Sequence, residues 1–412
     1  MESRQKLQQM ALHMDLEPAE EMRRPGGRAA ATTPSSQPDQ VQPCGLTPRQ
    51  ARLAELGIYH AKKPDGTTIP LLKTLLTSAC ERDCFYCPFR AGRDSKRYTF
   101  QPDEMAQAFM QLYRAQIADG IFLSSGIIQG GVKTQDRLLD TAAILRQTYQ
   151  YRGYLHLKLM PGAERDQIFQ AMTLADRLSI NLEAPNPGRL AAIAPRKTFF
   201  EELVRPLQLV EEIRQNEDPA RGWNGRWPST TTQFVVGGAG ETDVELLATT
   251  EYLTATLRLQ RAYFSAFRPI PDTPLEHLPP ENPLRQHRLY QTSFLFRDYG
   301  FELEELPFDE QGNLPLELDP KAAWAWSHLQ HDPVEINRAD REQLLRVPGL
   351  GPRSTRTILQ ARRLGVIREE SHLRQLGIRT RALRPFVLLD GRRPTYQLPL
   401  LPQDGSQPTP GT

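Results

Sequence analysis

Cys80-Glu81-Arg82-Asp83-Cys84-Phe85-Tyr86-Cys87 is the stretch on which the interpretation of this sequence depends. It places three cysteines in a C-x3-C-x2-C pattern directly after an apolar run, Leu71 to Leu76. Three thiolates within eight residues can converge on one metal cluster, although structural zinc takes four ligands and electron-transfer iron–sulfur clusters take four cysteines. Three ligands leave one iron of a 4Fe-4S cube open to a substrate or cofactor. The stretch therefore predicts a cluster with an incomplete set of protein ligands.

A zinc site is the alternative interpretation of these cysteines, with His60 or Cys44 as the fourth ligand. Neither residue has the spacing from the three cysteines that is typical of zinc ligand pairs, so the iron–sulfur interpretation is favoured. Cys44 follows residues 23–43, a stretch rich in Pro, Gly, Ala, Ser and Gln, and we interpret it as an incidental thiol at the end of a flexible linker.

The composition of the chain indicates a cytoplasmic globular protein. Apolar residues make up 39% of the 412 residues and charged residues 24%, as is typical of a chain that folds around a core. Four cysteines, three of them clustered, do not suggest a disulfide framework and suit a reducing compartment. We expect no membrane association, because the N-terminus lacks an apolar signal segment and the longest uncharged run near the middle, 120–132, is too short to span a bilayer.

Short apolar runs alternate with amphipathic stretches from residue 71 onward, which predicts six β-α repeats. Such repeats form a parallel sheet with helices outside, so we expect the α/β class and a partial (β/α)6 barrel. In barrels the chemistry lies at the C-terminal ends of the strands, and the cysteine stretch directly follows the first strand. The expected strands are 71–77, 121–125, 154–160, 179–183, 232–236 and 262–267; the expected helices are 102–119, 134–145 with Thr134 as its cap, 164–177, 199–215 and 243–257.

Two of these strands carry polar residues on one face. Side chains alternate along a strand, so Lys158 lies on the face opposite to the leucines of 154–160, and Asn181 and Glu183 lie opposite to Ile180 and Leu182. If the leucines pack on the outer helices, the polar side chains point into the barrel, where a buried charge must be paired or ligand-bound. A bound polar ligand and a Lys158–Glu183 ion pair both satisfy this requirement, and both can hold together.

The cysteine spacing, with aromatic Tyr86 just before the last cysteine, resembles the signature of the radical S-adenosylmethionine (radical SAM) enzymes. The resemblance implies that Cys80, Cys84 and Cys87 hold a 4Fe-4S cluster whose open iron chelates S-adenosyl-L-methionine. One electron, from an external donor of the flavodoxin or ferredoxin type, then cleaves this cofactor to methionine and a 5′-deoxyadenosyl radical. The protein binds, orients and shields, while the cofactor carries the radical chemistry.

Other strand ends match cofactor positions of the same family. Ser124-Ser125-Gly126 stands where the family has Gly-Gly-Glu, with fewer glycines and no acid, and Glu183 stands where a polar residue contacts the ribose. Gly237 and Gly238 begin a glycine-rich turn of the kind that lies beside the adenine. Arg268, after the last strand, faces either substrate or solvent, and solvent is favoured. The expected cofactor-binding residues are Tyr86, Ser124, Ser125, Gly126, Lys158, Asn181, Glu183, Gly237 and Gly238.

The sequence Val347-Pro348-Gly349-Leu350-Gly351-Pro352 lies between two expected helices, of which Asn337 caps the first with Asp340 as its capping-box acid. It resembles the helix-hairpin-helix module of DNA-repair proteins, in which glycines let backbone N–H groups approach a phosphate at a helix N-terminus. Residues 373–383 resemble a degenerate second hairpin. The expected DNA-binding residues are Pro348, Gly349, Leu350, Gly351, Arg353 and Arg356.

Positive charge is concentrated around this hairpin. Residues 341–393 contain thirteen Arg, no Lys and four acidic residues, a net charge of +9, whereas the whole chain carries +2. Such a concentration is typical of a surface that binds a phosphate backbone and positions the protein without reading base sequence. A small helical domain for protein contact is the alternative.

Together the motifs resemble radical SAM proteins with a C-terminal helix-hairpin-helix domain that are regarded as DNA modification or repair enzymes. The leading hypothesis is an enzyme whose radical acts on a nucleotide in DNA. The alternatives are a radical SAM enzyme acting on RNA or protein, and a non-catalytic DNA-binding protein with a structural cluster. The expected organisation is an N-terminal helix and linker (1–49), the partial barrel (50–270), a barrel-closing connector containing Trp324 and Trp326 (271–330), an all-α helix-hairpin-helix domain (331–395) and a flexible tail (396–412).

Overall fold

The structure is a computed structural model that describes residues 2–12, 14, 22–23, 53–62 and 68–396. The chain divides into two compact units, Met1–Gln286 and His287–Thr412, which we call the barrel unit and the C-terminal unit. Most of the expected linker with Cys44, and the expected tail after Tyr396, lie outside the described residues.

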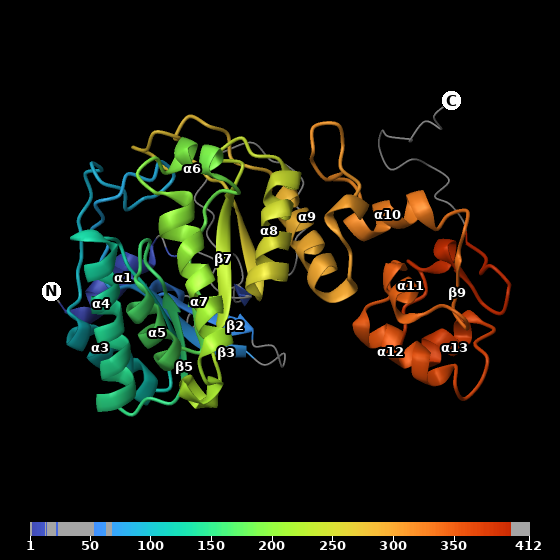
Figure 1. The fold of residues 1–412 in the computed structure, drawn as a ribbon, viewed down its shortest axis with the longest axis horizontal. Coiled ribbons are helices and arrows are strands. Elements are labelled where there is room, and N and C mark those ends of the chain that lie inside the picture. Colours follow the sequence, from blue (N-terminus) through green and yellow to red (C-terminus); the bar gives the residue numbers. More distant parts are fainter. Residues whose placement is uncertain (1, 13, 15–21, 24–52, 63–67, 397–412) are drawn as a thin grey trace. The chain divides into compact units, whose positions relative to one another are not determined.

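An eight-stranded sheet with its strands in sequence order forms the centre of the barrel unit (Figure 1). The last six strands are parallel, which confirms the predicted β-α repeats, and the first two are antiparallel additions that the sequence did not predict. The strands are β1 (Met22–Arg23), β2 (Ile58–Lys62), β3 (Thr68–Leu75), β4 (Gly120–Ser124), β5 (Tyr154–Lys158), β6 (Arg177–Ser179), β7 (Ser229–Val236) and β8 (Arg261–Ala266).

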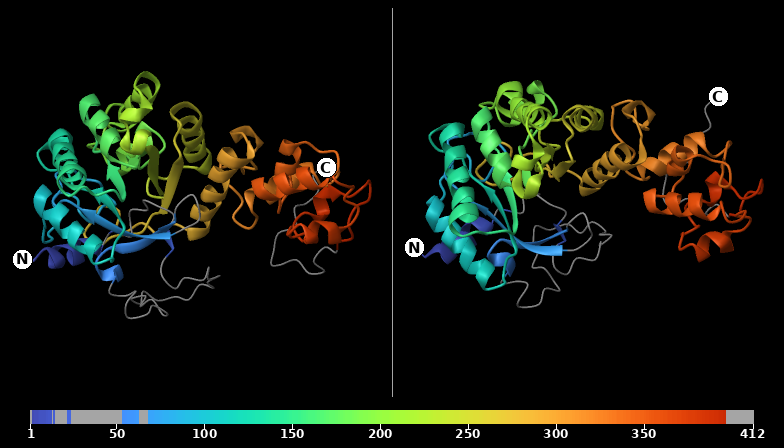
Figure 2. Two further views of the ribbon diagram at one scale, coloured as in Figure 1. Left: turned by 90° about the horizontal axis from the view of Figure 1, so that it is seen from below. Right: turned by 60° about the horizontal axis from the view of Figure 1, so that its bottom comes forward.

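Helices cover one face of this sheet and leave the other face to the site (Figures 1 and 2). Leu155, Leu157 and Leu159 are fully buried, as expected for parallel strands covered by helices. In register with them, Ile121 pairs with Leu155 and Leu123 with Leu157, so the apolar rows continue across the sheet. The helices are α3 (Pro102–Arg114), α4 (Gly130–Ala143), α5 (Arg165–Leu174), α6 (Pro187–Ile193), α7 (Arg205–Asn216) and α8 (Asp243–Leu257).

The expected cap at Thr134 is wrong. Helix α4 begins four residues earlier, at Gly130, so Thr134 lies inside it. Its hydroxyl instead accepts from the backbone N–H of Ile128 at 3.0 Å and is 2.9 Å from the carbonyl oxygen of Gly130. A threonine inside a helix can bond backbone groups that precede it as well as cap the helix from outside.

The expected strand 179–183 is misplaced, because β6 (Arg177–Ser179) shares only Ser179 with it. β6 ends at Ser179, and Glu183 contributes only an isolated bridge to Phe234. The chain then forms α6, which the sequence reading missed although Asn186-Pro187 is a good start signal: the Asn186 side chain accepts from the N–H of Arg189 at 2.9 Å, and proline takes the first helical position.

The N-terminus forms the expected short helix, α1 (Ser3–Ala11). Leu7 and Met10 are buried, while Leu12 is 66% exposed and is not part of the apolar face. The Lys6 ammonium binds the Glu104 carboxylate of α3 at 2.7 Å, which ties the helix to the barrel unit.

The C-terminal unit contains the last part of α9 (Pro283–Phe294), a π-helical turn (Leu295–Tyr299) and four further helices. Gly300 ends the turn at φ +70°, as predicted for a C-cap. Trp324 stacks on His328 and Trp326 meets Phe386 edge-on, so both pack inside this unit. The helices are α10 (Pro320–His328), α11 (Arg341–Arg346), α12 (Pro352–Ala361) and α13 (Glu370–Gln375), and β9 (Val334–Glu335) pairs in parallel with β10 (Val387–Leu388).

The expected cap of α11 at Asn337 is also wrong. Asp340 is the N-cap, and its carboxylate accepts from the N–H of Gln343 at 2.8 Å. Asn337 instead bonds both backbone groups of Ile367, at 2.8 and 2.9 Å, and so ties the start of this region to the segment after α12. Within the described residues, no helix is long and apolar enough to cross a membrane.

Candidate functional site

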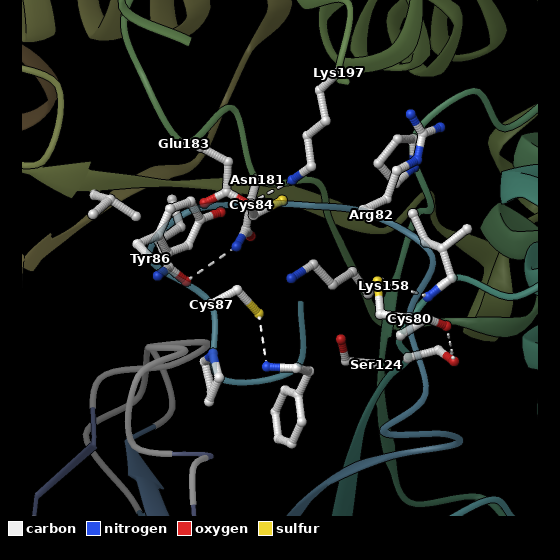
Figure 3. A pocket seen from close by; sticks show the side chains of 18 of the residues that line it. Cys80, Arg82, Cys84, Tyr86, Cys87, Ser124, Lys158, Asn181, Glu183 and Lys197 are labelled. Carbon is white, nitrogen blue, oxygen red and sulfur yellow. Dashed lines mark hydrogen bonds and ion pairs between the residues drawn. The ribbon is translucent and has the colours of Figure 1, made fainter. Parts of the chain in front are cut away.

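One pocket gathers the C-terminal ends of the parallel strands with the cysteine loop that follows β3 (Figure 3). Of the expected site residues, it is lined by Cys80, Cys84, Cys87, Tyr86, Ser124, Ser125, Gly126, Lys158, Asn181 and Glu183. These side chains come from points more than a hundred residues apart in the sequence. The parallel arrangement brings them to one edge of the sheet, where barrel enzymes place their chemistry.

The three cysteines lie around this pocket as free thiols. The N–H of Ile127 points at the Cys80 sulfur and that of Phe89 at the Cys87 sulfur, each at 3.4 Å. Such donors stabilise a thiolate and tune the potential of a cluster bound to it. Burial raises the pKa of Cys84 and of Cys87, so both thiols remain protonated until something positive, such as a metal, takes the proton's place.

The cysteine loop is fastened to residues 193–202, which follow β6. The N–H of Phe85 donates to the carbonyl of Ile193 at 2.7 Å. Arg82 binds the carbonyl of Arg196 and the carboxylate of Glu202, and Arg196 in turn lies 3.3 Å from Asp83. These contacts hold the three cysteines against the rest of the barrel before any cluster is present.

Gly126 lets the turn after β4 approach the cysteine loop closely. Its N–H donates to the carbonyl of Thr77 at 2.7 Å. A Cβ at this position would lie 2.2 Å from the carbonyl oxygen of Ala79, which is a prohibitive contact. The family's Gly-Gly-Glu is thus replaced here by a turn in which Ser125 bonds the Gly126 carbonyl at 2.7 Å and Ser124 is buried.

Glu183 is paired with Lys197, which the sequence reading did not single out. The Lys197 ammonium lies 3.0 Å from the Glu183 carboxylate, and the side chains are 9% and 6% exposed. Burial opposes ionisation of Glu183, but Lys197 and Lys158 together hold its pKa below the usual value. Burial lowers the pKa of Lys158 to about 8, with Glu183 opposing the shift. Both lysines therefore act on Glu183, and Lys197 makes the direct contact.

Asn181 completes the polar side of the pocket. Its amide nitrogen lies 3.4 Å from the side-chain oxygen of Gln233 on β7. The backbone of Glu183 bonds β7 on both sides, to Gln233 and Val235, and takes φ +68°. These bonds fix the direction of the Glu183 side chain, since left-handed backbone is strained for a residue other than glycine and persists only where the surroundings enforce it.

Gly237 and Gly238 do not line the pocket. The backbone N–H groups of their turn are already bonded within the chain. The Glu241 carboxylate accepts from the N–H groups of Gly237 and Ala239, at 2.5 and 3.1 Å. A Cβ at Gly237, where φ is +87°, would also meet the Glu281 side chain at 2.3 Å. The glycines therefore serve a close internal approach, and the expectation that they contact the cofactor has no support from this geometry.

Several residues of the pocket were missed by the sequence reading. Lys197 lies in a loop with no periodic pattern, and Gln233 was taken only as part of an apolar strand. Arg82 belongs to the cysteine stretch itself and could have been noticed there. Arg268 lines the pocket although its side chain is exposed, so it stands at the rim.

A parallel β/α sheet with a three-cysteine loop at its C-terminal edge defines the class of the radical SAM fold. Residues 74–253 match the family model described as the Radical SAM superfamily. This segment, which is less than half of the chain, is a radical SAM domain. Members of this superfamily use a 4Fe-4S cluster and S-adenosylmethionine.

Solved structures similar to the chain include a maturase of the FeFe-hydrogenase, HydG (10% identity, TM-score 0.43, 55% of this chain and 49% of that one). Others are methylornithine synthase, PylB (14%, 0.43, 55% and 63%), and a radical SAM methyltransferase from Sphaerobacter thermophilus (14%, 0.40, 57% and 69%). The chain thus spans about half of the HydG chain and less than two thirds of the PylB chain. No curated protein matches the sequence.

The residues of the pocket fit a 4Fe-4S cluster better than zinc. Figure 3 shows Cys80, Cys84 and Cys87 at separate places in the pocket, with the Lys158 side chain drawn among them, whereas zinc needs all of its ligands around one point. No group of three or more His, Cys, Asp or Glu in the described part of the chain is placed to hold a metal ion. His60 pairs with Pro70, five positions and roughly 16 Å before the end of β3 at Leu75, so it is no fourth ligand.

A second expected site lies in the C-terminal unit, at the five residues that join α11 to α12. Gly349 is exposed with φ +84°, and Gly351 precedes α12 without a side-chain cap. Leu350 is 1% exposed, and its carbonyl accepts from the buried Lys321 ammonium at 2.6 Å. Pro348 is buried as well. Leu350 and Pro348 thus shape the turn from inside, and Gly349, Gly351, Arg353 and Arg356 are the expected contact residues that face outward.

Proposed function

We propose that this protein is a radical SAM enzyme that acts on DNA, using a 4Fe-4S cluster held by Cys80, Cys84 and Cys87. When bound, the cluster and S-adenosylmethionine supply a 5′-deoxyadenosyl radical that abstracts hydrogen. The chain's own residues bind and orient: the cysteine loop carries the ligands, and Glu183 and Asn181 offer polar contacts to the cofactor. The target would be a nucleotide in which a lesion is repaired or a modification is installed.

The observation that carries the DNA proposal is a set of unpaired arginines in the C-terminal unit. Within the part of the chain that the structure describes, they are exposed and form no ion pair; they are Arg338, Arg341, Arg353, Arg356, Arg363, Arg379, Arg381, Arg392 and Arg393. Arginines that stabilise a fold are usually paired, as Arg346 is with Glu305 and Arg384 with Glu370. Exposed and unpaired arginines instead suit the phosphates of a nucleic acid.

The turn between α11 and α12 supports the same partner. A Cβ at Gly349 would lie 3.2 Å from Ala382 and 3.8 Å from the carbonyl of Arg379, so the segment 379–383 lies beside the turn. Arg353 and Arg356 belong to α12, which follows the turn, and Arg379 and Arg381 belong to the segment beside it. Free N–H groups at the start of α12 add positive potential at the same place, as in the helix-hairpin-helix module that the sequence resembles. A duplex held by its backbone would still need to release its target base to an active-site pocket.

Cofactor cleavage in the presence of DNA tests the proposal. Anaerobic reconstitution should give three to four irons per chain, and a reductant with S-adenosylmethionine should yield 5′-deoxyadenosine at a rate that duplex DNA increases. Arg353→Glu with Arg356→Glu should remove the stimulation and leave basal cleavage. Arg226→Glu, which changes an exposed and unpaired arginine of the barrel unit, is the matched control.

Two results would contradict the proposal. A colourless protein with one zinc per chain would remove the radical chemistry altogether. Cleavage that RNA or a protein extract stimulates, and that DNA leaves unchanged, would keep the radical chemistry and reassign the substrate. Product analysis of oligonucleotides after turnover would then identify the reaction.

A further inference from the structure

Lys197 lies beside the cysteines although it belongs to no motif. It sits in the loop between α6 and a π-helical turn (Phe199–Val204), and its side chain is 9% exposed. Figure 3 shows its ammonium pointing from above toward Glu183 and Cys84. It lines the same pocket as all three cysteines. A buried cation at this place must serve either the fold or the group that the cysteines hold.

Four cationic side chains line the pocket: Arg82, Lys158, Lys197 and Arg268. Arg82 has its head group engaged by Glu202 and by the carbonyl of Arg196, and Arg268 is exposed. Lys158 and Lys197 are the two lysines drawn near the cysteines in Figure 3. Of these two lysines, Lys197 forms an ion pair with Glu183 at 3.0 Å and points toward Cys84 (Figure 3). A buried ammonium that is paired with a carboxylate stays charged, because each group compensates the other.

Glu183 is the ion-pair partner that offsets the positive charge of Lys197. Its side chain is 6% exposed, and one carboxylate oxygen lies 3.0 Å from the Lys197 ammonium. The Tyr86 side chain also interacts with this carboxylate. Lys197 and Tyr86 therefore hold a negative charge beside the cysteine loop.

We propose that Lys197 is a positioning residue that raises the reduction potential of the cluster held by Cys80, Cys84 and Cys87, with Glu183 acting in the opposite direction. Reduction adds one negative charge to a site that already contains thiolates. A fixed ammonium beside that site stabilises the reduced state, and the low local dielectric makes its effect larger than in water. The inference uses the ligand assignment of the proposed function and is independent of the DNA substrate.

The test is a potentiometric titration of the reconstituted cluster, followed by electron paramagnetic resonance without added cofactor. Lys197→Met should hold the same iron and show about tenfold less reduced cluster at a fixed potential, which corresponds to about 59 mV for one electron. Lys197→Arg keeps the charge and should stay near the wild type. Glu183→Gln should shift the potential upward.

Equal potentials for the wild type and Lys197→Met, at equal iron content, would overturn the proposal. If Lys197→Met loses its cluster, Glu183→Gln decides: an upward shift supports the charge argument, and an unchanged potential overturns it. Cys84→Ala tests the ligand assignment separately from the effect of Lys197 on the reduction potential, because it should lose iron. If Cys84→Ala holds as much iron as the wild type, the ligand assignment is refuted, whatever potentials the Lys197 variants show.

Discussion

Gly126 and Ala79 come so close that no side chain fits between them: a Cβ at Gly126 would lie 2.2 Å from the Ala79 carbonyl oxygen. Ala79 directly precedes the first cysteine, so this contact places the cysteine loop against the end of β4. We expect Gly126→Ala to shift the loop and cost about 1 to 3 kcal/mol of stability, as overpacking does.

Iron content after reconstitution and the midpoint of thermal unfolding should both fall in this variant. Gly188→Ala is the matched control, because its nearest neighbour is the Asn186 side chain at an ordinary 3.5 Å. A Gly126→Ala protein with full iron content and unchanged unfolding would show that the turn tolerates displacement.

Arg146 ties together the opposite end of the barrel. Its guanidinium, in a side chain that is 2% exposed, donates to the carbonyls of Leu174, Tyr151 and Gly153 at 2.8 to 2.9 Å and to the Asp176 carboxylate at 3.0 Å. Arg146→Met removes the guanidinium donors from three carbonyls and leaves Asp176 with the N–H of Leu155, so we expect a loss of about 3 kcal/mol or more.

Arg146→Lys should recover little of the loss, since an ammonium cannot reproduce the planar fork. Urea denaturation measures the difference, and the neighbouring exposed Arg152→Met is the control. Equal stability of Arg146→Lys and the wild type would show that charge alone suffices.

Lys321 makes the stability of the C-terminal unit depend on pH. Burial lowers its pKa to about 7, with Asp319 opposing and Arg346 reinforcing the shift, and its ammonium also faces the ring of Tyr299 at 4.4 Å. The unfolded chain, with an ordinary lysine pKa near 10.5, binds more protons than the folded chain between about pH 7 and pH 10.5. Stability therefore rises with pH across this window, by up to about 1.4 kcal/mol per pH unit.

Hydrogen exchange of peptides covering α11 and α12, corrected for the intrinsic pH dependence of exchange, should show protection increasing from pH 7 to pH 9. Lys321→Met should flatten this increase, whereas Lys133→Met, which removes an exposed lysine of the barrel unit, should not. A wild-type protein without the pH slope would mean that Lys321 stays charged in the folded unit.

The six parallel strands and the meeting of three cysteines with Lys158, Asn181 and Glu183 could be predicted from the sequence. Side-chain alternation places Lys158 opposite the leucines of β5, and parallel strand ends meet at one edge whatever their separation along the chain. Glu183 lies beyond the end of β6, and its direction is set by its backbone bonds to β7. Lys197 could not be found in this way, because a loop has no periodicity and its reach to Glu183 depends on α6. The prediction that Gly237 contacts the cofactor also failed to foresee a contact made by a single polar residue. The N–H of Gly237 does bind an anion, but that anion is the Glu241 carboxylate of the same chain.

The caps at Thr134 and Asn337 were misplaced because side chains of this type bond backbone groups both inside and outside helices. The antiparallel strand β2 was missed since its sequence, Ile58-Tyr59-His60-Ala61-Lys62, has no strong alternation and gains its place only by pairing with β3. Long, regular apolar patterns thus predicted the sheet, whereas contacts made by single polar residues could be identified only in the structure.

The substitution Gly349→Val tests the proposed contact between the C-terminal unit and DNA. The φ of +84° at Gly349 strains any other residue, and a Cβ would press on Ala382 at 3.2 Å, so Gly349→Val should deform the turn between α11 and α12. The N–H groups of the turn would then no longer face a phosphate together. We expect at least tenfold weaker binding of a DNA duplex at moderate salt, with iron content and cofactor cleavage without DNA unchanged.

The salt dependence of binding gives the second readout. Affinity of the wild type should fall steeply as salt rises, because arginine–phosphate contacts release counterions, and Gly365→Ala, in open space of the same unit, should behave like the wild type. Binding of Gly349→Val that matches the wild type at every salt concentration would remove the turn from the DNA contact. Wild-type binding that is independent of salt would argue against phosphate recognition by the arginines as well, and would favour a protein partner for this unit.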